Sequence, residues 1–322
     1  MQTVSNQHQF HPAAFPWPAR DYENEAIAPL QATLKKSVSC IGVGVHSGKS
    51  STLTLRPATV GTGYVFLRGD LPQGQNTIPA RFDAVSDTRM CTTLSNKQGA
   101  SISTVEHVVA ALAGAGITNA IIEVNGPEVP IMDGSSFVFS QMIRSTGTFS
   151  QGESAPSIKI VKPVRVGSEN AFAEFVPSEN RSITMTFDAG GRLPASMKQD
   201  EFTFDYDADD FSSLLCDART FGFYEDAAKL WAAGLAKGAS LNNTVVIQDD
   251  AVMNVDGLRS HDELIRHKVL DAIGDLALAG VVIHGHFRGH NSGHALNNQL
   301  LRAVFSTQGA WTADSLPQQM FL

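Results

Sequence analysis

Apolar and polar residues alternate along much of the chain, and this two-residue period predicts short β-strands. Residues 37–56 show the alternation on both sides of a glycine-containing turn, so we expect a strand–turn–strand hairpin there. Three further strands are predicted by the sequences GYVFLR (63–68), TIPARF (77–82) and CTTLS (91–95). We expect these strands to build a sheet.

The pattern then changes to the period of a helix. The sequence STVEHVVAALAGAG (103–116) predicts a helix with Ser103 or Thr104 as its N-cap and with a pair of glycines at its end. A strand, NAIIEVNG (119–126), follows it. A second helix is predicted between the sequence IMDGSS and about Ser145.

The second half of the chain repeats this order of elements. Its predicted elements are a strand–turn–strand unit (157–177), two strands (183–190 and 200–206), a long helix (260–280), a strand (281–289) and a further helix (295–301). In both halves, a helix that contains histidine ends in Ala-Gly and leads into an apolar strand. We therefore expect an α+β fold of two related domains, each a sheet with helices on one face, packed together.

The predicted domain boundaries follow from local composition. Residues 1–30 are polar and interrupted by proline, so we expect a flexible extension there. The sequence GTFSQGESAPS (147–157) is polar and rich in Gly and Ser, which is typical of a linker. We place this linker at 151–157, between a first domain of residues 31–150 and a second domain of residues 158–322.

Composition limits the classes of function. The 322 residues suggest about two domains, with 43% hydrophobic and 17% charged residues as in ordinary globular proteins. The formal net charge of −8 argues against nucleic-acid binding. Three widely spaced cysteines predict no disulfide framework, so we expect a cytoplasmic protein. No signal peptide is recognisable, and the longest apolar run (276–283) is too short to span a membrane. We expect a monomer.

The turn sequence GVGVHSGKS (42–50) is similar to a phosphate-binding loop, which would indicate a nucleotide kinase or hydrolase. Such a loop needs a glycine where this chain has Val43, and it opens a helix. Here residues 51–57 alternate like a strand instead. We therefore predict a hairpin turn and keep a nucleotide-dependent kinase as the alternative function.

Two helical motifs carry side chains suited to catalysis. His107 could bind a metal while the preceding Glu106 holds the water on it, or the pair could be an exposed Glu beside a packed His. His267 and Asp271 lie at i and i+4 on one helix face, a spacing at which both can bind one metal or form a surface ion pair. Asp275 continues the same face.

Two loop motifs add further candidates. In RGHNSGHALNNQLLR, His294 lies where a loop leads into a helix, a place suited to an acid, although the histidines of this tract could also simply face solvent. Thr220 in DARTFGF could donate a hydrogen bond in a pocket or belong to a plain turn. One histidine of the first helix and the His–Asp pair of the second would provide the three ligands of a catalytic zinc. A neighbouring Glu and a free His would then supply the base and the acid.

Six stretches of the chain, in order, resemble the motifs of UDP-3-O-acyl-N-acetylglucosamine deacetylases, the zinc enzymes of lipid A biosynthesis. They span about residues 32–306 and read TLKKSVSCIGVGVHSGKSSTLTLRPA, STVEHVVAALAGAGITNA, EVPIMDGSS, DARTFGF, DGLRSHDELIRHKVLDAIGDL and SGHALNNQLLRA. The resemblance implies two domains of similar β-α-α-β topology with the active site between them. It also implies a UDP-glucosamine substrate with a 3-O-hydroxyacyl chain, whose N-acetyl group is released as acetate to leave a free 2-amine.

The resemblance also implies roles for individual residues. A Zn²⁺ ion would be held by His107, His267 and Asp271. Glu106 would be the general base that accepts a proton from the attacking water. His294 would be the acid and would be charged at the working pH.

Four further residues complete the site that the resemblance implies. Asp275 would position His294, and Thr220 would donate a hydrogen bond to the oxyanion. Lys268 would meet a phosphate of the substrate, and Phe221 would line the substrate site.

The chain departs from the family pattern at several positions. Ala171 stands where many members have a Lys, and Ala189 stands where an aromatic residue is more usual. The turn in MDGSSFVF is also shorter than usual. These departures leave the catalytic residues unchanged and concern how the UDP and acyl groups are held. His46, in the turn 42–50, is expected near the mouth of the site.

Overall fold

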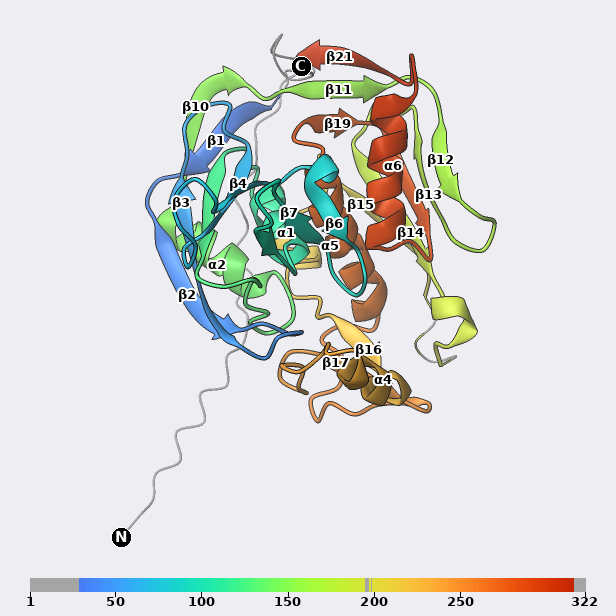
Figure 1. Cartoon of the computed structure of the whole chain (residues 1–322). Coiled ribbons are helices and arrows are strands. Elements are labelled where there is room, and N and C mark those ends of the chain that lie inside the picture. Colours follow the sequence, from blue (N-terminus) through green and yellow to red (C-terminus); the bar gives the residue numbers. More distant parts are fainter. Residues whose placement is uncertain (1–28, 195–196, 198, 316–322) are drawn as a thin grey trace.

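A computed structural model of the chain describes residues 29–194, 197 and 199–315 (Figure 1). The extension predicted at 1–30 therefore lies almost wholly outside the described residues. The described chain has an α+β fold, as predicted. Two five-stranded sheets dominate it, one from each half of the sequence.

The two large sheets have the same topology. In each, the first two strands form an antiparallel hairpin, the third is antiparallel to the second, the fourth is parallel to the third, and the fifth is antiparallel to the fourth. The strands of the first sheet are, in spatial order, β2 (Val38–Val43), β3 (Ser50–Pro57), β9 (Ala120–Val124), β4 (Tyr64–Arg68) and β5 (Thr77–Pro79). Those of the second sheet are β12 (Val164–Gly167), β13 (Phe172–Val176), β20 (His286–His290), β14 (Ser182–Phe187) and β15 (Gln199–Asp205). The duplication predicted from the order of elements is thus confirmed.

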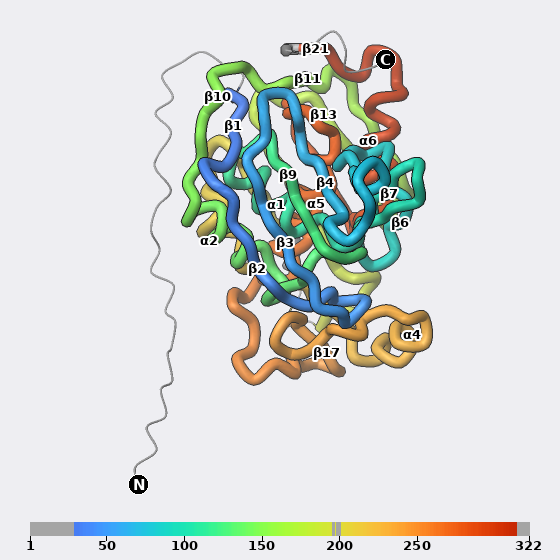
Figure 2. The backbone as a smooth tube through the Cα atoms, turned by 60° about the vertical axis from the view of Figure 1, so that its left-hand side comes forward, coloured from blue at the N-terminus to red at the C-terminus, as the bar shows by residue number. Residues whose placement is uncertain are grey.

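The helices of the two halves meet between these sheets. Figure 1 shows α1 (Glu106–Gly114) and α5 (Glu263–Ala277) side by side in the centre of the molecule, and Figure 2 shows them behind the first sheet. Two more helices, α2 (Phe137–Thr146) and α6 (His294–Ser306), pack against α1 and α5 respectively. Because α1 and α5 are buried between two sheets, most of their side chains are inaccessible to water.

Strand alternation explains the core. In β3 the side chains of Leu53 and Leu55 are fully buried, while Thr52 and Thr54 lie on the other face. The same alternation places Phe287 of β20 in the core of the second half. Apolar residues at every second position therefore cover the faces of α1 and α5, which is the packing that the period predicted.

Smaller elements surround the two large sheets. They are β1 (Leu30–Leu34), β10 (Thr148–Ser154), β6 (Val85–Asp87), β7 (Thr93–Ser95), β8 (Ser101–Ile102), β11 (Ser157–Ile160), β19 (Val282–His284), β21 (Trp311–Ser315), β16 (Phe221–Phe223), β17 (Val245–Gln248), β18 (Ala251–Val252), α3 (Phe211–Leu214), α4 (Ala227–Ala232), and the 3₁₀ turns η1 (Phe82–Ala84), η2 (Ala189–Gly191) and η4 (Tyr224–Asp226). No helix in the described parts of the chain is both long enough and apolar enough to cross a bilayer.

Three local predictions differ from the structure. The segment 148–154, which has the composition of a linker, forms β10 because its backbone pairs with β1. The strand predicted at 281–289 is divided at Gly285, so that β19 and β20 belong to different sheets. A Cβ at position 285 would lie 2.9 Å from the Ile160 side chain, so glycine lets the chain pass between the sheets.

The predicted N-cap of α1 is also wrong. The helix begins at Glu106, and its N-cap is Val105, without a side-chain cap. The Thr104 hydroxyl instead donates to the Glu128 carboxylate (3.2 Å), and the Ser103 hydroxyl accepts from Thr93 (3.0 Å). The two side chains that the local sequence predicts as caps therefore form hydrogen bonds with residues outside the helix.

Candidate active site

The site is built where α1 and α5 touch. The helices approach closely because Gly274 has no side chain: a Cβ there would lie 2.2 Å from the Glu106 carbonyl oxygen. This contact brings the first turn of α1 against the face of α5 that carries His267, Asp271 and Asp275, and all of these side chains are buried. The i, i+4 face predicted from the sequence therefore points at α1 and not at solvent.

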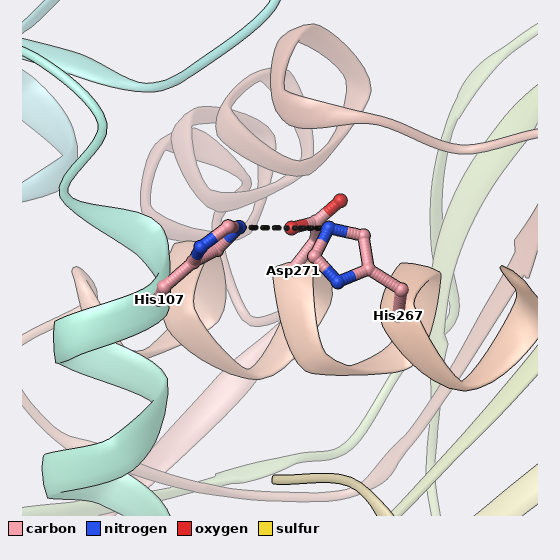
Figure 3. Close-up of side chains that lie close together, drawn as sticks. All are labelled: His107, His267 and Asp271. Carbon is pink, nitrogen blue, oxygen red and sulfur yellow. Dashed lines mark ion pairs between the residues drawn. The ribbon is translucent and has the colours of Figure 1, made fainter. Parts of the chain in front are cut away.

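Figure 3 shows His107 of α1 facing His267 and Asp271 of α5. The Asp271 Oδ1 atom lies 3.6 Å from His107 Nε2 and 3.4 Å from His267 Nε2. The possible ligand atoms of the three residues all lie within 4.8 Å of one another. Tetrahedral zinc with bonds of about 2.0–2.1 Å has neighbouring ligand atoms about 3.3 Å apart, so the spacing fits this ion.

The protonation state of His267 is set by its second ring nitrogen. His267 Nδ1 lies 2.9 Å from the carbonyl oxygen of Ala218, which can only accept, so Nδ1 is the donor. Burial lowers the pKa of His267 to about 4, although the Asp271 charge acts in the opposite direction. At neutral pH His267 therefore turns the lone pair of Nε2 toward Asp271, the tautomer that binds a metal.

Asp271 supplies charge to this group. Burial tends to raise the pKa of Asp271, but His267 and Lys268 outweigh it and hold the pKa well below the usual range. Its Oδ2 accepts a hydrogen bond from Lys268 Nζ (3.1 Å), whereas the buried Oδ1 has no hydrogen-bond partner. A carboxylate oxygen that faces a nitrogen lone pair in a buried site calls for a cation between them. The donor set of two imidazoles and a carboxylate fits zinc.

A second group of titratable side chains lies beside the first. His294, at the start of α6, has Nδ1 2.8 Å from Asp275 Oδ2 and Nε2 3.9 Å from Glu106 Oε1. Burial by itself would lower the pKa of His294, but the charges of Asp275 and Glu106 raise it to about 10. His294 is therefore charged at neutral pH, as an acid must be.

Glu106 is buried at the edge of both groups. Burial raises the pKa of Glu106, and the nearby His294 and His107 partly offset this effect. Its Oε2 accepts from the backbone N–H of Thr92 (3.1 Å), which leaves Oε1 on the side of His294. A carboxylate with a raised pKa is suited to accept a proton from water. Glu106 is such a carboxylate, and it lies next to the metal-type group, the three possible ligands His107, His267 and Asp271.

Comparison with known proteins identifies the family. Residues 31–306 match the model of the UDP-3-O-acyl N-acetylglycosamine deacetylase family. The chain belongs to this family. Over 282 residues, 87% of this chain, it is 48% identical to a UDP-3-O-acyl-N-acetylglucosamine deacetylase of Pasteurella multocida and 46% identical to one of Histophilus somni, and each alignment covers 92% of the relative. A relative of the same name from Legionella pneumophila is 46% identical over 282 residues, 87% of this chain and 91% of its own length.

Of the three residues that the deacetylase resemblance assigns to the substrate, Phe221 and Lys268 contact residues of the group His107, His267 and Asp271. The Phe221 ring lies 6.2 Å from the His267 ring and nearly perpendicular to it. Thr220 precedes β16, and its backbone N–H donates to the Gly134 carbonyl (2.7 Å). Lys268 is half-buried and is held by Asp271, with its ammonium group close to Gly293, the residue before α6. Phe221 and Lys268 thus lie beside ligands of the group His107, His267 and Asp271, while Thr220 is fixed by its backbone contact with Gly134.

Two positions at which this chain departs from the deacetylase pattern meet around Asn291. The Asn291 amide donates to the Asn170 carbonyl oxygen (3.2 Å), next to Ala171, and to Asp188 Oδ1 (2.7 Å), next to Ala189. The hydrogen bond from Asn291 is the main reason that the pKa of Asp188 is lowered. The small side chains at 171 and 189 therefore flank one polar contact between three loops.

The turn 42–50 is the hairpin turn between β2 and β3, and it is fixed from two sides. The buried Glu128 carboxylate accepts from the backbone N–H groups of His46 (2.7 Å) and Ser47 (2.8 Å). The backbone N–H of Lys237 donates to the His46 carbonyl oxygen (3.2 Å), which joins the turn to the loop after α4. His46 also lines a cavity of about 250 Å³ with Cys91 and Glu128. Burial lowers the pKa of His46, and the charge of His294 contributes to this shift.

Sequence reasoning missed several residues that hold the site together. Three of these contact a site residue and one holds the turn at His46: they are Thr92, the Ala218 carbonyl and Asn297, and Glu128. Most of these contacts join parts of the chain that are far apart in sequence, so no local sequence pattern predicts them. Asn297 is the exception, because it lies three residues after His294 on the same helix and therefore on the same face.

Proposed function

We propose that the chain is a zinc-dependent amidohydrolase that removes the N-acetyl group of UDP-3-O-(3-hydroxyacyl)-N-acetylglucosamine in lipid A biosynthesis. The products would be acetate and the free 2-amine. The observation that carries the proposal is the buried Asp271 Oδ1, which has no hydrogen-bond partner and faces the Nε2 atoms of His107 and His267 at 3.6 and 3.4 Å. A metal centre of this kind is what hydrolysis of an unreactive amide requires.

His107, His267 and Asp271 would hold the Zn²⁺ ion. When bound, zinc supplies Lewis acidity, which polarises the amide carbonyl and lowers the pKa of a coordinated water to about 7. The hydrogen bond from His267 Nδ1 to Ala218 fixes the ring and leaves the Nε2 lone pair available as a metal ligand. Lys268, bonded to Asp271 Oδ2, leaves Oδ1 free for the same purpose.

Proton transfer falls to Glu106 and His294. Glu106 accepts the proton of the attacking water through the carboxylate oxygen that faces the site. His294 donates a proton to the leaving amine, and Asp275 keeps it oriented and charged through the 2.8 Å contact at Nδ1. Thr220 would donate a hydrogen bond to the oxyanion, a contribution of about 3 kcal/mol in comparable sites.

The substrate would lie along the outer side of this group. Lys268 would meet a phosphate of the UDP group, and Phe221 would line the pocket for the sugar or its acyl chain. We place the enzyme in the cytoplasm as a monomer, with domains at 31–150 and 158–322.

Two other functions make different predictions. A nucleotide-dependent kinase would use Gly42–Ser50, but this turn joins two antiparallel strands and does not open a helix. A sugar-nucleotide binder with a structural metal would need a closed site of four protein ligands. The metal-type group in the described part of the chain has three members, which favours a catalytic ion with an open position.

The test is mass spectrometry of UDP-3-O-acyl-N-acetylglucosamine after incubation with catalytic amounts of the zinc-loaded protein. Loss of the acetyl group and appearance of acetate are expected. Lys49→Ala serves as the matched variant for the kinase alternative and should turn over like the wild type. An intact substrate after incubation with folded, zinc-loaded protein would overturn the proposal.

A further inference from the structure

Thr92 lies at the meeting point of the two proton-transfer groups. Its backbone N–H donates to Glu106 Oε2 (3.1 Å), and its hydroxyl donates to Asp275 Oδ1 (2.6 Å). Asp275 in turn holds His294 at 2.8 Å. One residue from the segment before β7 therefore contacts both the carboxylate on α1 and the carboxylate on α5.

The backbone at position 92 is itself firmly placed. The Thr92 carbonyl oxygen accepts from the backbone N–H of Val105, the N-cap of α1 (3.4 Å), and the side chain is 2% exposed. Met90, two residues earlier, has a left-handed backbone (φ 66°), which turns the chain toward the site. The two hydrogen-bond donors of Thr92 therefore have a fixed position, and the carboxylates that accept from them must adopt one orientation.

The hydroxyl of Thr92 is one of three groups that fix the orientation of the Asp275 carboxylate, and it is the one bound to Oδ1. Asp275 Oδ1 accepts from Thr92, while Oδ2 accepts from both His294 Nδ1 and the Asn297 amide (2.8 Å each). The Asn297 amide is oriented by Ser292, whose hydroxyl donates to Asn297 Oδ1 (2.7 Å). Without this donor, Oδ1 would be a buried carboxylate oxygen with no partner, and only the two contacts at Oδ2 would hold the carboxylate against His294.

We propose that Thr92 is a positioning residue that orients the general base Glu106 through its backbone and the acid His294 through Asp275. The proposal rests on the roles proposed above for Glu106 and His294. Thr92 does not touch the reacting atoms; it couples the two proton-transfer groups by tying their carboxylates to one rigid point. Its hydroxyl acts on the step that protonates the leaving amine, and its N–H acts on the step that removes the water proton.

Three variants separate the hydroxyl from the backbone. Thr92→Val removes the donor to Asp275 and keeps the shape and the N–H to Glu106. Thr92→Ser keeps both donors. Thr93→Val is the matched control, because the Thr93 hydroxyl donates to Ser103 and contacts neither carboxylate.

Steady-state turnover of the acylated UDP-sugar is measured with each zinc-loaded protein. We expect Thr92→Val to lower kcat by roughly 10–100-fold, as loss of a hydrogen bond that orients a functional side chain does, with KM and zinc content unchanged. Thr92→Ser should restore kcat to near the wild-type value, and Thr93→Val should not change it. If Thr92→Val does not fold, Thr92→Ala carries the same expectation for kcat.

A double-mutant cycle distinguishes positioning from general damage. In a His294→Gln background, Thr92→Val should cause little further loss, because the group through which its hydroxyl acts is gone. Equal losses in both backgrounds would overturn the proposal, as would a wild-type kcat for folded Thr92→Val. Absence of turnover in the wild type would instead contradict the proposed function, so the two failures are distinguishable.

Discussion

Gly274 of α5 and Glu106 of α1 are in backbone contact, with room for no side chain at position 274. A Cβ there would lie 2.2 Å from the Glu106 carbonyl oxygen and 2.9 Å from its carbonyl carbon. Since neither atom belongs to a flexible side chain, any larger residue must push the two helices apart. His107 and the ligands of α5 would separate with them.

Gly274→Ala should therefore weaken both stability and metal binding. We expect a loss of about 1–3 kcal/mol in the free energy of unfolding, as overpacking does, together with at least tenfold weaker zinc binding. Denaturant unfolding and zinc titration measure these effects. Gly126→Ala is the control, because a Cβ there meets nothing nearer than 3.8 Å. Unchanged zinc affinity in Gly274→Ala would show that the helix contact does not set the metal geometry.

Glu106 and His107 are neighbours in sequence but should respond differently to removal. Glu106→Ala should keep zinc and lose kcat by roughly 10²–10⁴-fold, since the lost group is a general base. His107→Ala should lose zinc itself. Metal analysis by mass spectrometry and turnover assays on both variants make the comparison. Near-full turnover of Glu106→Ala would refute its assignment as the base.

Asp271→Asn should remove most of the dependence of stability on zinc. The lowered pKa of Asp271 means that its charged carboxylate, which accepts from Lys268 Nζ, stabilises the folded protein, so the neutral amide should lower the melting temperature in chelator. With zinc present, the difference from the wild type should widen, because only the wild type binds the ion strongly. Thermal unfolding in chelator and in zinc gives both values. The same difference under both conditions would contradict the metal site.

His294 should titrate far above the usual range. In metal-free protein, burial opposes the charge, but Asp275 and Glu106 raise the pKa from 6.5 to about 10. A raised pKa stabilises the folded protein fully below pH 6.5, and this contribution is lost as the pH rises through about 10. The stability difference between wild type and His294→Gln should therefore shrink over this window. NMR titration of the imidazole gives the pKa directly, and a midpoint near pH 6.5 would exclude the charged pair.

Much of the fold could be predicted from the sequence because its elements are strongly periodic. The alternation in β3 and the helical pattern of α1 and α5 each reflect a buried face, so local pattern and tertiary packing agree there. Where local pattern and tertiary packing disagree, the tertiary contacts determine the structure. Ser103 and Thr104 cap nothing because Thr93 and Glu128 bind them, and residues 148–154 form a strand because β1 supplies a partner.

The candidate site was predictable only in part for a similar reason. His267 and Asp271 are four residues apart on one helix, so their shared face could be inferred from the sequence. Residue types and family resemblance suggested His107 and His294, but the distance of His107 to α5 depends on the packing at Gly274, and that of His294 on the packing of α6 against α5. Thr92 could not be found at all, because its contact with Asp275 spans 183 residues and threonine carries no distinctive signal.

Zinc held by the three buried residues His107, His267 and Asp271 is what would make this chain a deacetylase. The most direct test strips the protein of metal, adds zinc back in steps, and follows release of acetate from UDP-3-O-acyl-N-acetylglucosamine at each step. Turnover should be absent in the metal-free protein and should rise until one zinc is bound per chain. Turnover that persists without metal, or no acetate release from the fully loaded protein, would contradict a zinc-dependent deacetylase.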